Sequence, residues 1–144
     1  MASAVEEHFS GLVLRLPPGL VLASSTQEEV PSPVPGLPPS VERFRRYAGE
    51  AGVALHLFHF EGVHLRDRGP LSYAATWALT VDGRAVTAGR TRLFFGRPQE
   101  VLVAHLVHPA PSHGRYLVYA TGMDRPVFDR LMEGIRFEGV AGPG

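Results

Sequence analysis

Seven histidines are the residues of this sequence best suited to chemistry, and four of them form two closely spaced pairs. Two residues separate His56 from His59, and two separate His105 from His108. Imidazole suits zinc or nickel, but each pair lies in a segment with strand character, where residues i and i+3 point to opposite faces. Neither pair can chelate one ion alone. A cross-strand site that takes one histidine from each pair stays open, but we expect no metal and no other cofactor.

Arginine and tryptophan side chains indicate where a ligand or a protein partner would bind. Arg90 and Arg92 alternate on one predicted strand and, near His105, would form a cationic face for an anionic ligand or an acidic protein surface. Trp77 would line a cleft between sheet and helix. We favour the simpler interpretation, in which the arginine stems cover one side of the sheet and Trp77 belongs to the core. The candidate binding residues are Trp77, Arg90, Arg92 and His105.

No pattern typical of a catalytic centre stands out in the sequence. Ser112 and His113 are adjacent, between Pro111 and Gly114, which is typical of a turn and not of a nucleophile with its base. No Gly-x-Ser-x-Gly motif, phosphate-binding glycine loop or spaced carboxylate pair is present. The absence of cysteine excludes thiolate nucleophiles and disulfides. We therefore expect no catalytic residues.

Length and charge limit the class of protein. A chain of 144 residues fits one domain, which we place at residues 8–140 between flexible tails at 1–7 and 141–144. The formal net charge of zero gives no basic field to attract nucleic acid. No apolar run approaches the ~20 residues that span a bilayer, and the first residues do not resemble a secretory signal. We expect a cytoplasmic protein without a membrane partner.

The first half of the chain predicts two strands, a loop, a helix and a third strand. Residues 8–16 and 20–23 have strand patterns separated by a Pro-Pro-Gly turn. Residues 24–39 have no period and contain five prolines, which predicts an exposed proline-rich loop. Apolar residues at helical spacing then predict a helix over 41–50, and residues 53–60 read as a strand.

The second half predicts consecutive antiparallel strands. Asp82-Gly83 is typical of a two-residue hairpin turn, which pairs the strand of Trp77 with the strand that follows. Uninterrupted pairing would place Arg90 and Arg92 on the aromatic face. We therefore predict a β-bulge at Ala88-Gly89, because one extra residue would turn both arginines away from Trp77.

The last strands and a C-terminal helix complete the predicted fold. The segment 101–107 is apolar on both faces, so it needs cover on both sides of the sheet. Asp124 and Pro126 are suited to start a helix that ends near Ile135. The predicted fold class is α+β: one antiparallel sheet of about five to seven strands packed with two helices.

Four phrases of the sequence carry a family resemblance. They are Gly19-Leu-Val21, Val81-Asp-Gly-Arg-Ala85, Tyr116-Leu-Val-Tyr119 and Phe128-Asp-Arg-Leu-Met-Glu-Gly-Ile-Arg-Phe137. In this order they resemble the PsbP-like family, which includes an extrinsic protein of photosystem II and a Ran-binding import factor, over most of residues 8–138. The resemblance implies αβα layering and a mostly non-catalytic protein that acts through protein partners. It carries no functional residue onto this chain.

These observations lead to three hypotheses about function. The first is a non-catalytic binding or accessory protein that engages an unknown protein partner through its sheet face or the proline-rich loop. The second is a protein, and in one version an enzyme, that binds a small ligand or metal in a cleft near Trp77, Arg92 and His105 or His108. The third is a homodimer joined across an exposed sheet face.

Overall fold

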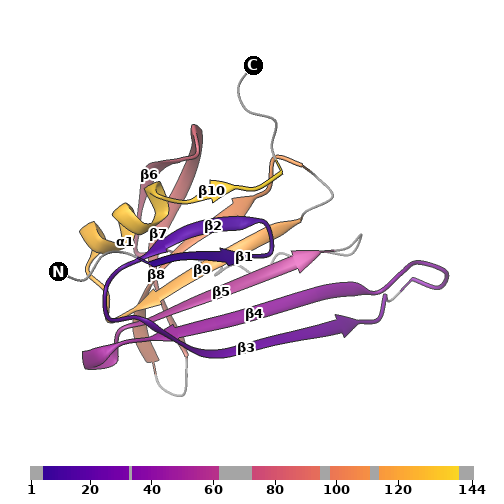
Figure 1. The fold of residues 1–144 in the computed structure, drawn as a ribbon, viewed down its shortest axis with the longest axis horizontal. Coiled ribbons are helices and arrows are strands. Elements are labelled where there is room, and N and C mark those ends of the chain that lie inside the picture. Colours follow the sequence, from indigo (N-terminus) through magenta and orange to yellow (C-terminus); the bar gives the residue numbers. More distant parts are fainter. Residues whose placement is uncertain (1–4, 33, 62–72, 95–97, 111–113, 140–144) are drawn as a thin grey trace.

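Two antiparallel β-sheets make up the fold (Figure 1). The structure is a computed structural model that describes residues 5–32, 34–61, 73–94, 98–110 and 114–139. The elements are β1 (Val5–Phe9), β2 (Leu12–Leu16), β3 (Val21–Val30), β4 (Ser40–Ala48), the 3₁₀ turn η1 (Glu50–Gly52), β5 (Ala54–Glu61), β6 (Ala75–Val81), β7 (Arg84–Phe94), β8 (Pro98–Val107), β9 (Arg115–Thr121), α1 (Arg125–Glu133) and β10 (Arg136–Phe137).

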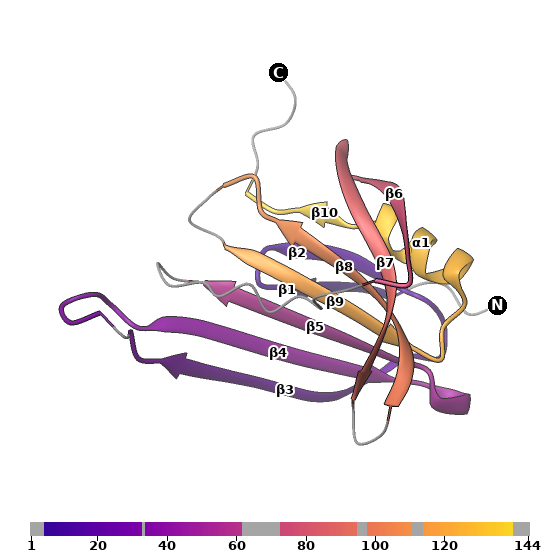
Figure 2. The same cartoon turned by 180° about the vertical axis from the view of Figure 1, so that it is seen from behind.

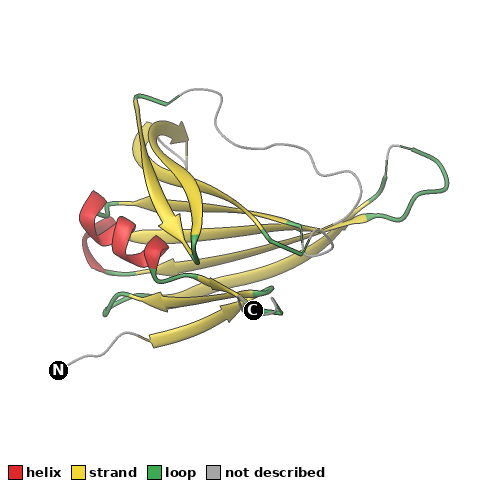
Figure 3. Cartoon of the chain, turned by 90° about the horizontal axis from the view of Figure 1, so that it is seen from above, coloured by secondary structure: helices red, strands yellow, loops and turns green. Residues whose placement is uncertain are grey.

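The larger sheet has seven strands in the order β3-β4-β5-β9-β8-β7-β6, and the smaller has the order β1-β2-β10. Hairpins connect β3 to β5 and β6 to β9, and the pairing of β5 with β9 joins the two groups. The smaller sheet lies as a second layer against one face of the larger, with α1 beside it (Figure 3). We call the face of the larger sheet against which this layer lies the covered face, and the opposite face the outer face. Figure 2, which views the molecule from behind, shows the outer face.

The predicted fold class, one sheet packed with two helices in the αβα layering that the PsbP-like resemblance implies, is wrong. The described residues contain one α-helix and are mostly strand. The segment 41–50, predicted as a helix, is largely β4, whose register with β5 sends Phe44 to the outer face and Tyr47 to the covered face. Phe44 and Tyr47 would share one side of a helix, so a strand with aromatic groups on both faces imitates a helical stripe over so short a run. Arg45 of this strand lies over the Phe9 ring at 5.2 Å.

Two further boundaries differ from the prediction. Residues 24–30 of the expected loop at 24–39 instead form the second part of β3. The proline-rich connection is therefore confined to residues 31–39. The single strand expected over 8–16 is a hairpin, because Ser10 and Gly11 have φ values of 47° and 89° and reverse the chain. Its first strand, β1, begins at Val5, inside the expected tail.

The predicted β-bulge in β7 is absent. Pairing is continuous from Val81 opposite Arg84 to Ala75 opposite Arg90, so Arg90 and Arg92 share the covered face with Trp77. Gly89 has another role: a Cβ there would lie 2.2 Å from the Tyr73 ring, which packs on this backbone from the outer face. The glycine makes room for an aromatic ring and does not change the register.

One large apolar cluster fills the space between the layers. It includes buried side chains of the β1–β2 hairpin, of α1 and of the covered face of the seven-stranded sheet, among them Leu14, Leu57, Val118, Leu106 and Phe128. A smaller buried cluster, which includes Val101, Val103 and Leu117, lies on the outer face. The prediction that the segment 101–107 is covered on both sides is therefore confirmed for Val101 to Ala104, whereas on the outer face His105 is half-buried and Val107 is exposed.

The predicted hairpin turn and C-terminal helix are confirmed. Asp82 and Gly83 both have positive φ, as a two-residue turn between twisted strands requires. The Asp82 carboxylate also accepts a hydrogen bond from the Phe137 amide at 3.1 Å, which joins this turn to β10. Asp124 precedes α1, and its carbonyl accepts from the Val127 and Phe128 amides.

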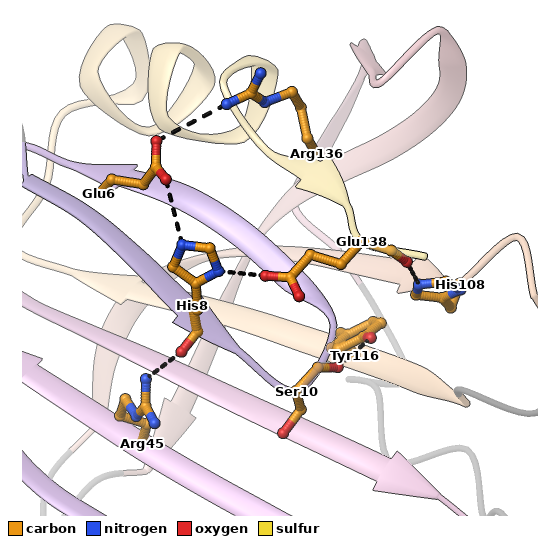
Figure 4. A network of polar contacts seen from close by, with 8 residues as sticks. All are labelled: Glu6, His8, Ser10, Arg45, His108, Tyr116, Arg136 and Glu138. Carbon is orange, nitrogen blue, oxygen red and sulfur yellow. Dashed lines mark hydrogen bonds and ion pairs between the residues drawn. The ribbon is translucent and has the colours of Figure 1, made fainter. Parts of the chain in front are cut away.

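Polar contacts join the β1–β2 hairpin to the seven-stranded sheet (Figure 4). Arg45 of β4 donates to the His8 carbonyl at 2.8 Å, and the buried Tyr116 hydroxyl of β9 donates to the Ser10 carbonyl at 2.6 Å. Both acceptors are main-chain groups at one end of β1. The hairpin position is thus set by directional bonds in addition to apolar packing.

Glu138, directly after β10, joins the two layers a second time (Figure 4). Its carboxylate accepts from exposed His8 and raises the pKa of that imidazole. Its carbonyl lies 2.9 Å from Nε2 of buried His108, whose Nδ1 accepts from the Ala110 amide. His108 Nε2 therefore carries the proton, and this histidine serves as a neutral structural bridge.

Candidate interaction edge

The four residues that the sequence indicates as a binding site do not meet at one place. Trp77, Arg90 and Arg92 lie on the covered face, whereas His105 lies on the outer face of β8, opposite Leu117. The two faces are separated by the thickness of the sheet, so no cleft contains both His105 and Trp77.

Trp77 connects α1 to β6. Its indole Nε1 donates to the Asp129 carboxylate at 2.8 Å, and the Arg125 guanidinium carbon lies 4.0 Å from the centre of its ring. Arg125 and Asp129 also form an i,i+4 ion pair at 3.3 Å. These contacts give the half-buried tryptophan a structural role at the helix.

A hollow of about 340 Å³ lies between the start of α1 and the covered face, and Arg90 forms part of its wall. Arg90 Nε is 2.8 Å from a Glu100 carboxylate oxygen, as an ion pair. Arg125 and Asp124 also line the hollow, so two guanidinium groups face two carboxylates there. With its charges compensated, this hollow does not favour an anionic ligand.

A second hollow, of about 470 Å³, lies where the connections β2–β3, β4–β5 and β9–α1 meet. Its wall is mainly apolar, with Leu20, Val53 and Met123, and its charged groups are the exposed carboxylates of Glu50 and Asp124. Among these lining residues no base, nucleophile or cation accompanies the two carboxylates. The arrangement therefore does not indicate a reaction.

The histidine pairs lie as their spacing predicts. His56 and His59 point to opposite faces of β5. His59 stacks on the Tyr116 ring with centroids 4.6 Å apart, while His56 lies across from Arg46. Within the described part of the chain, no three metal-binding side chains are close enough together to hold an ion. The Ser112-His113 segment is outside the described residues.

The feature best suited to binding is the free edge of β3. This strand ends the seven-stranded sheet, so β4 pairs with it on one side only (Figure 1). Every residue from 21 to 29 is exposed, and the β3–β4 hairpin extends beyond the ends of its neighbours (Figures 1 and 2). An edge of this kind presents unpaired main-chain donors and acceptors to any extended chain.

Apolar groups gather at both ends of this edge. Val21 and Leu22 at its start are 66% and 56% exposed, and Val34 and Leu37 in the following connection are 46% and 44% exposed. These four belong to the seven exposed large apolar residues of the described chain. Exposed apolar groups concentrated along one element are typical of an interaction surface.

The middle of β3 is regular and polar. A bulge between Leu22 and Ser24 interrupts its pairing with β4, after which the register is continuous to Val30. In this run Glu28 lies directly across from Glu42 on the outer face. We call Ser24–Val30 the open run. It has the length of an ordinary strand and offers one free side.

The sequence did not predict this edge. A strand exposed on both faces lacks the alternation that marks half-buried strands, so the open run reads as part of a loop. The usable signal was the composition of residues 21–30, which contain no glycine and no proline in a chain with 16 and 13 of them.

The chain matches no family model, no curated protein and no solved structure. Within the described residues, no helix is both long enough and apolar enough to cross a bilayer. The arguments for function below therefore depend on the geometry of this chain.

Proposed function

We propose that this protein is a non-catalytic binding module that pairs an extended segment of a protein partner with the free edge of β3. The observation that carries the proposal is the exposure of nine consecutive residues on a terminal strand of a seven-stranded sheet. Strand addition of this kind takes its affinity from main-chain hydrogen bonds and its specificity from neighbouring side chains.

The surroundings of the edge support this function. The apolar side chains at the ends of β3 would contact the added segment where main-chain pairing stops, and removing them from water would contribute to binding. The hydrogen-bonded attachment of the β1–β2 hairpin keeps that layer on the covered face, away from the edge.

Site-specific cross-linking tests the proposal, because the chain has no cysteine of its own. Thr26→Cys places one thiol in the open run, and Thr80→Cys places one on β6, the opposite terminal strand; both threonines are exposed. Each variant would be labelled with a short photoactivatable cross-linker and returned to cell extract. The cross-linked peptides would then be sequenced by mass spectrometry.

The expected result is one defined polypeptide segment joined to position 26 and not to position 80. A synthetic peptide of that segment should slow amide hydrogen exchange in β3 when it is added to the unlabelled protein. Equal cross-linking at the two positions, none at position 26, or unchanged exchange in β3 would contradict the proposal.

A further inference from the structure

We infer that the segment added to β3 is β3 of a second copy of this chain, in antiparallel orientation and with its two-fold axis at Thr26. The inference rests on the proposed function and names its partner. The two seven-stranded sheets would join edge to edge into one continuous sheet.

Geometry restricts the register of such a pair. Residues directly opposite one another in antiparallel strands share a face, so the axis must pass through a residue and not between two. An axis at Thr26 places Ser24 opposite Glu28 of the second copy and Ser25 opposite Gln27. An axis at Glu28 would instead bring the two Glu28 carboxylates face to face, which is unfavourable.

Charge selects the same axis. Glu28 is exposed and lies across from Glu42, so two carboxylates are neighbours on the outer face at this edge. Within the described chain, Glu28 has no ion-pair partner. A cation supplied from the open side would pair with the Glu28 carboxylate.

Arg46 is the residue that supplies this cation. It lies on the outer face of β4 directly beside Ser24, is exposed, and forms no ion pair with any described residue. With the axis at Thr26, Arg46 of one copy and Glu28 of the other are two strands apart, about 10 Å between Cα atoms. The small Ser24 side chain between them leaves the path open for two long side chains. The two-fold axis creates this contact twice.

Neighbouring registers do not use Arg46 in this way. An axis at Thr26 is the one that aligns Glu28, Ser24 and Arg46 in a single row across the interface. An axis at Gln27 would place Glu29 in the row of Arg45, whose guanidinium already donates to the His8 carbonyl and to the Tyr47 hydroxyl. The bulge before Ser24 and the proline at position 31 limit the pairing to the open run.

Charge reversal tests the inference in the 144-residue chain. Glu28→Arg and Arg46→Glu each place like charges across the interface, and we expect each to raise the dimer dissociation constant at least tenfold in sedimentation equilibrium. The double variant Glu28→Arg/Arg46→Glu restores opposite charges and should return the constant to within about threefold of the wild-type value. Both side chains are exposed, so we expect all variants to fold, and circular dichroism checks this.

Mixing the two single variants gives a sharper result. One chain then carries arginine at positions 28 and 46 and the other carries glutamate at both, so a mixed dimer has two complementary pairs. We expect the mixture to dimerise with a dissociation constant at least tenfold lower than that of either variant alone. Under oxidising conditions Thr26→Cys should form a disulfide-linked dimer across the axis, whereas Thr80→Cys should not.

Several outcomes would overturn the inference. A wild-type protein that stays monomeric to millimolar concentration, a dimer unaffected by either single variant, or single variants that do not complement one another would each do so. If the protein is monomeric and position 26 cross-links to a different polypeptide, the second copy is excluded while the proposed binding edge stands. If position 26 cross-links to nothing, both proposals fail.

Discussion

The two terminal strands of the seven-stranded sheet, β3 and β6, have opposite surroundings. On β6, Leu79 and Val81 are buried and Trp77 is bound by α1, whereas residues 21–29 of β3 are all exposed. Exposed sheet edges are usually shielded, because they can pair with other chains. Since one edge of this sheet is anchored to a helix and the other is not, the difference indicates which edge is available for pairing.

The largest expected effect comes from truncating an apolar side chain at the helix-anchored edge, compared with the same kind of truncation at the open edge. Phe128→Ala removes a fully buried ring of α1 and should lower the free energy of unfolding by about 3–5 kcal/mol. Val21→Ala removes an exposed side chain of β3 and should change it by less than about 0.5 kcal/mol. Guanidinium unfolding followed by circular dichroism, at a concentration where the protein is monomeric, measures both. Similar losses in the two variants would refute the comparison.

The same difference explains which elements were predictable. In β6, Trp77, Leu79 and Val81 alternate with polar or small residues, and the Asp82-Gly83 turn fixes the next strand, so the pattern predicted this hairpin correctly. The open run has no buried face and therefore no alternation to detect. In β4, aromatic residues three apart fit a helix and a strand equally well, and the long-range pairing with β5 decides between them.

The candidate site was less predictable than the strands because it depends on sheet order. β3, and not β5, ends this side of the sheet because β9 pairs with β5, which joins Ala54 to Thr121 across nearly half of the sequence. Local spacing contains no information about such a pairing. Gly89 shows the same limit: the sequence indicated a special backbone position, but only the contact with Tyr73 explains it.

An intermediate effect should come from the polar link between α1 and β6. Asp129→Ala removes the acceptor of the Trp77 indole and the ion-pair partner of Arg125. It should lower the free energy of unfolding by about 2 kcal/mol. Trp77 is the single tryptophan, so its fluorescence emission reports the change directly and should shift to longer wavelength. Glu133→Ala, at an exposed position of the same helix, is the matched control. Equal losses of stability for the two variants, with no change in emission, would show that the link does not stabilise this edge.

The smallest expected effect depends on pH and concerns His56, which lies on the outer face two strands from the open edge. Burial lowers the pKa of His56 to about 4, with a further contribution from the Arg46 guanidinium across from it; Tyr119 faces it from β9. In the unfolded chain the same imidazole titrates near 6.5. Between these values the unfolded state binds a proton that the folded state does not, so stability falls as the pH decreases from about 6.5 to about 4.

Replacing this histidine isolates its contribution. Between pH 7 and pH 5 the free energy of unfolding of His56→Gln should fall by about 1 kcal/mol less than that of the wild-type protein. One proton gives at most about 1.4 kcal/mol per pH unit, and solvent screening reduces this. His8 acts in the opposite sense, because its raised pKa stabilises the fold below pH 6.5 and this stabilisation is lost as the pH rises. His8 is present in both proteins, so its contribution cancels in the comparison.

If Glu28 of a second copy neutralises Arg46, the pKa of His56 should also rise with protein concentration. NMR titration of the His56 ring protons, in dilute and in concentrated solution, measures this dependence. A pKa that rises with concentration would show that pairing at the open edge affects His56, whereas a pKa independent of concentration would show that it does not.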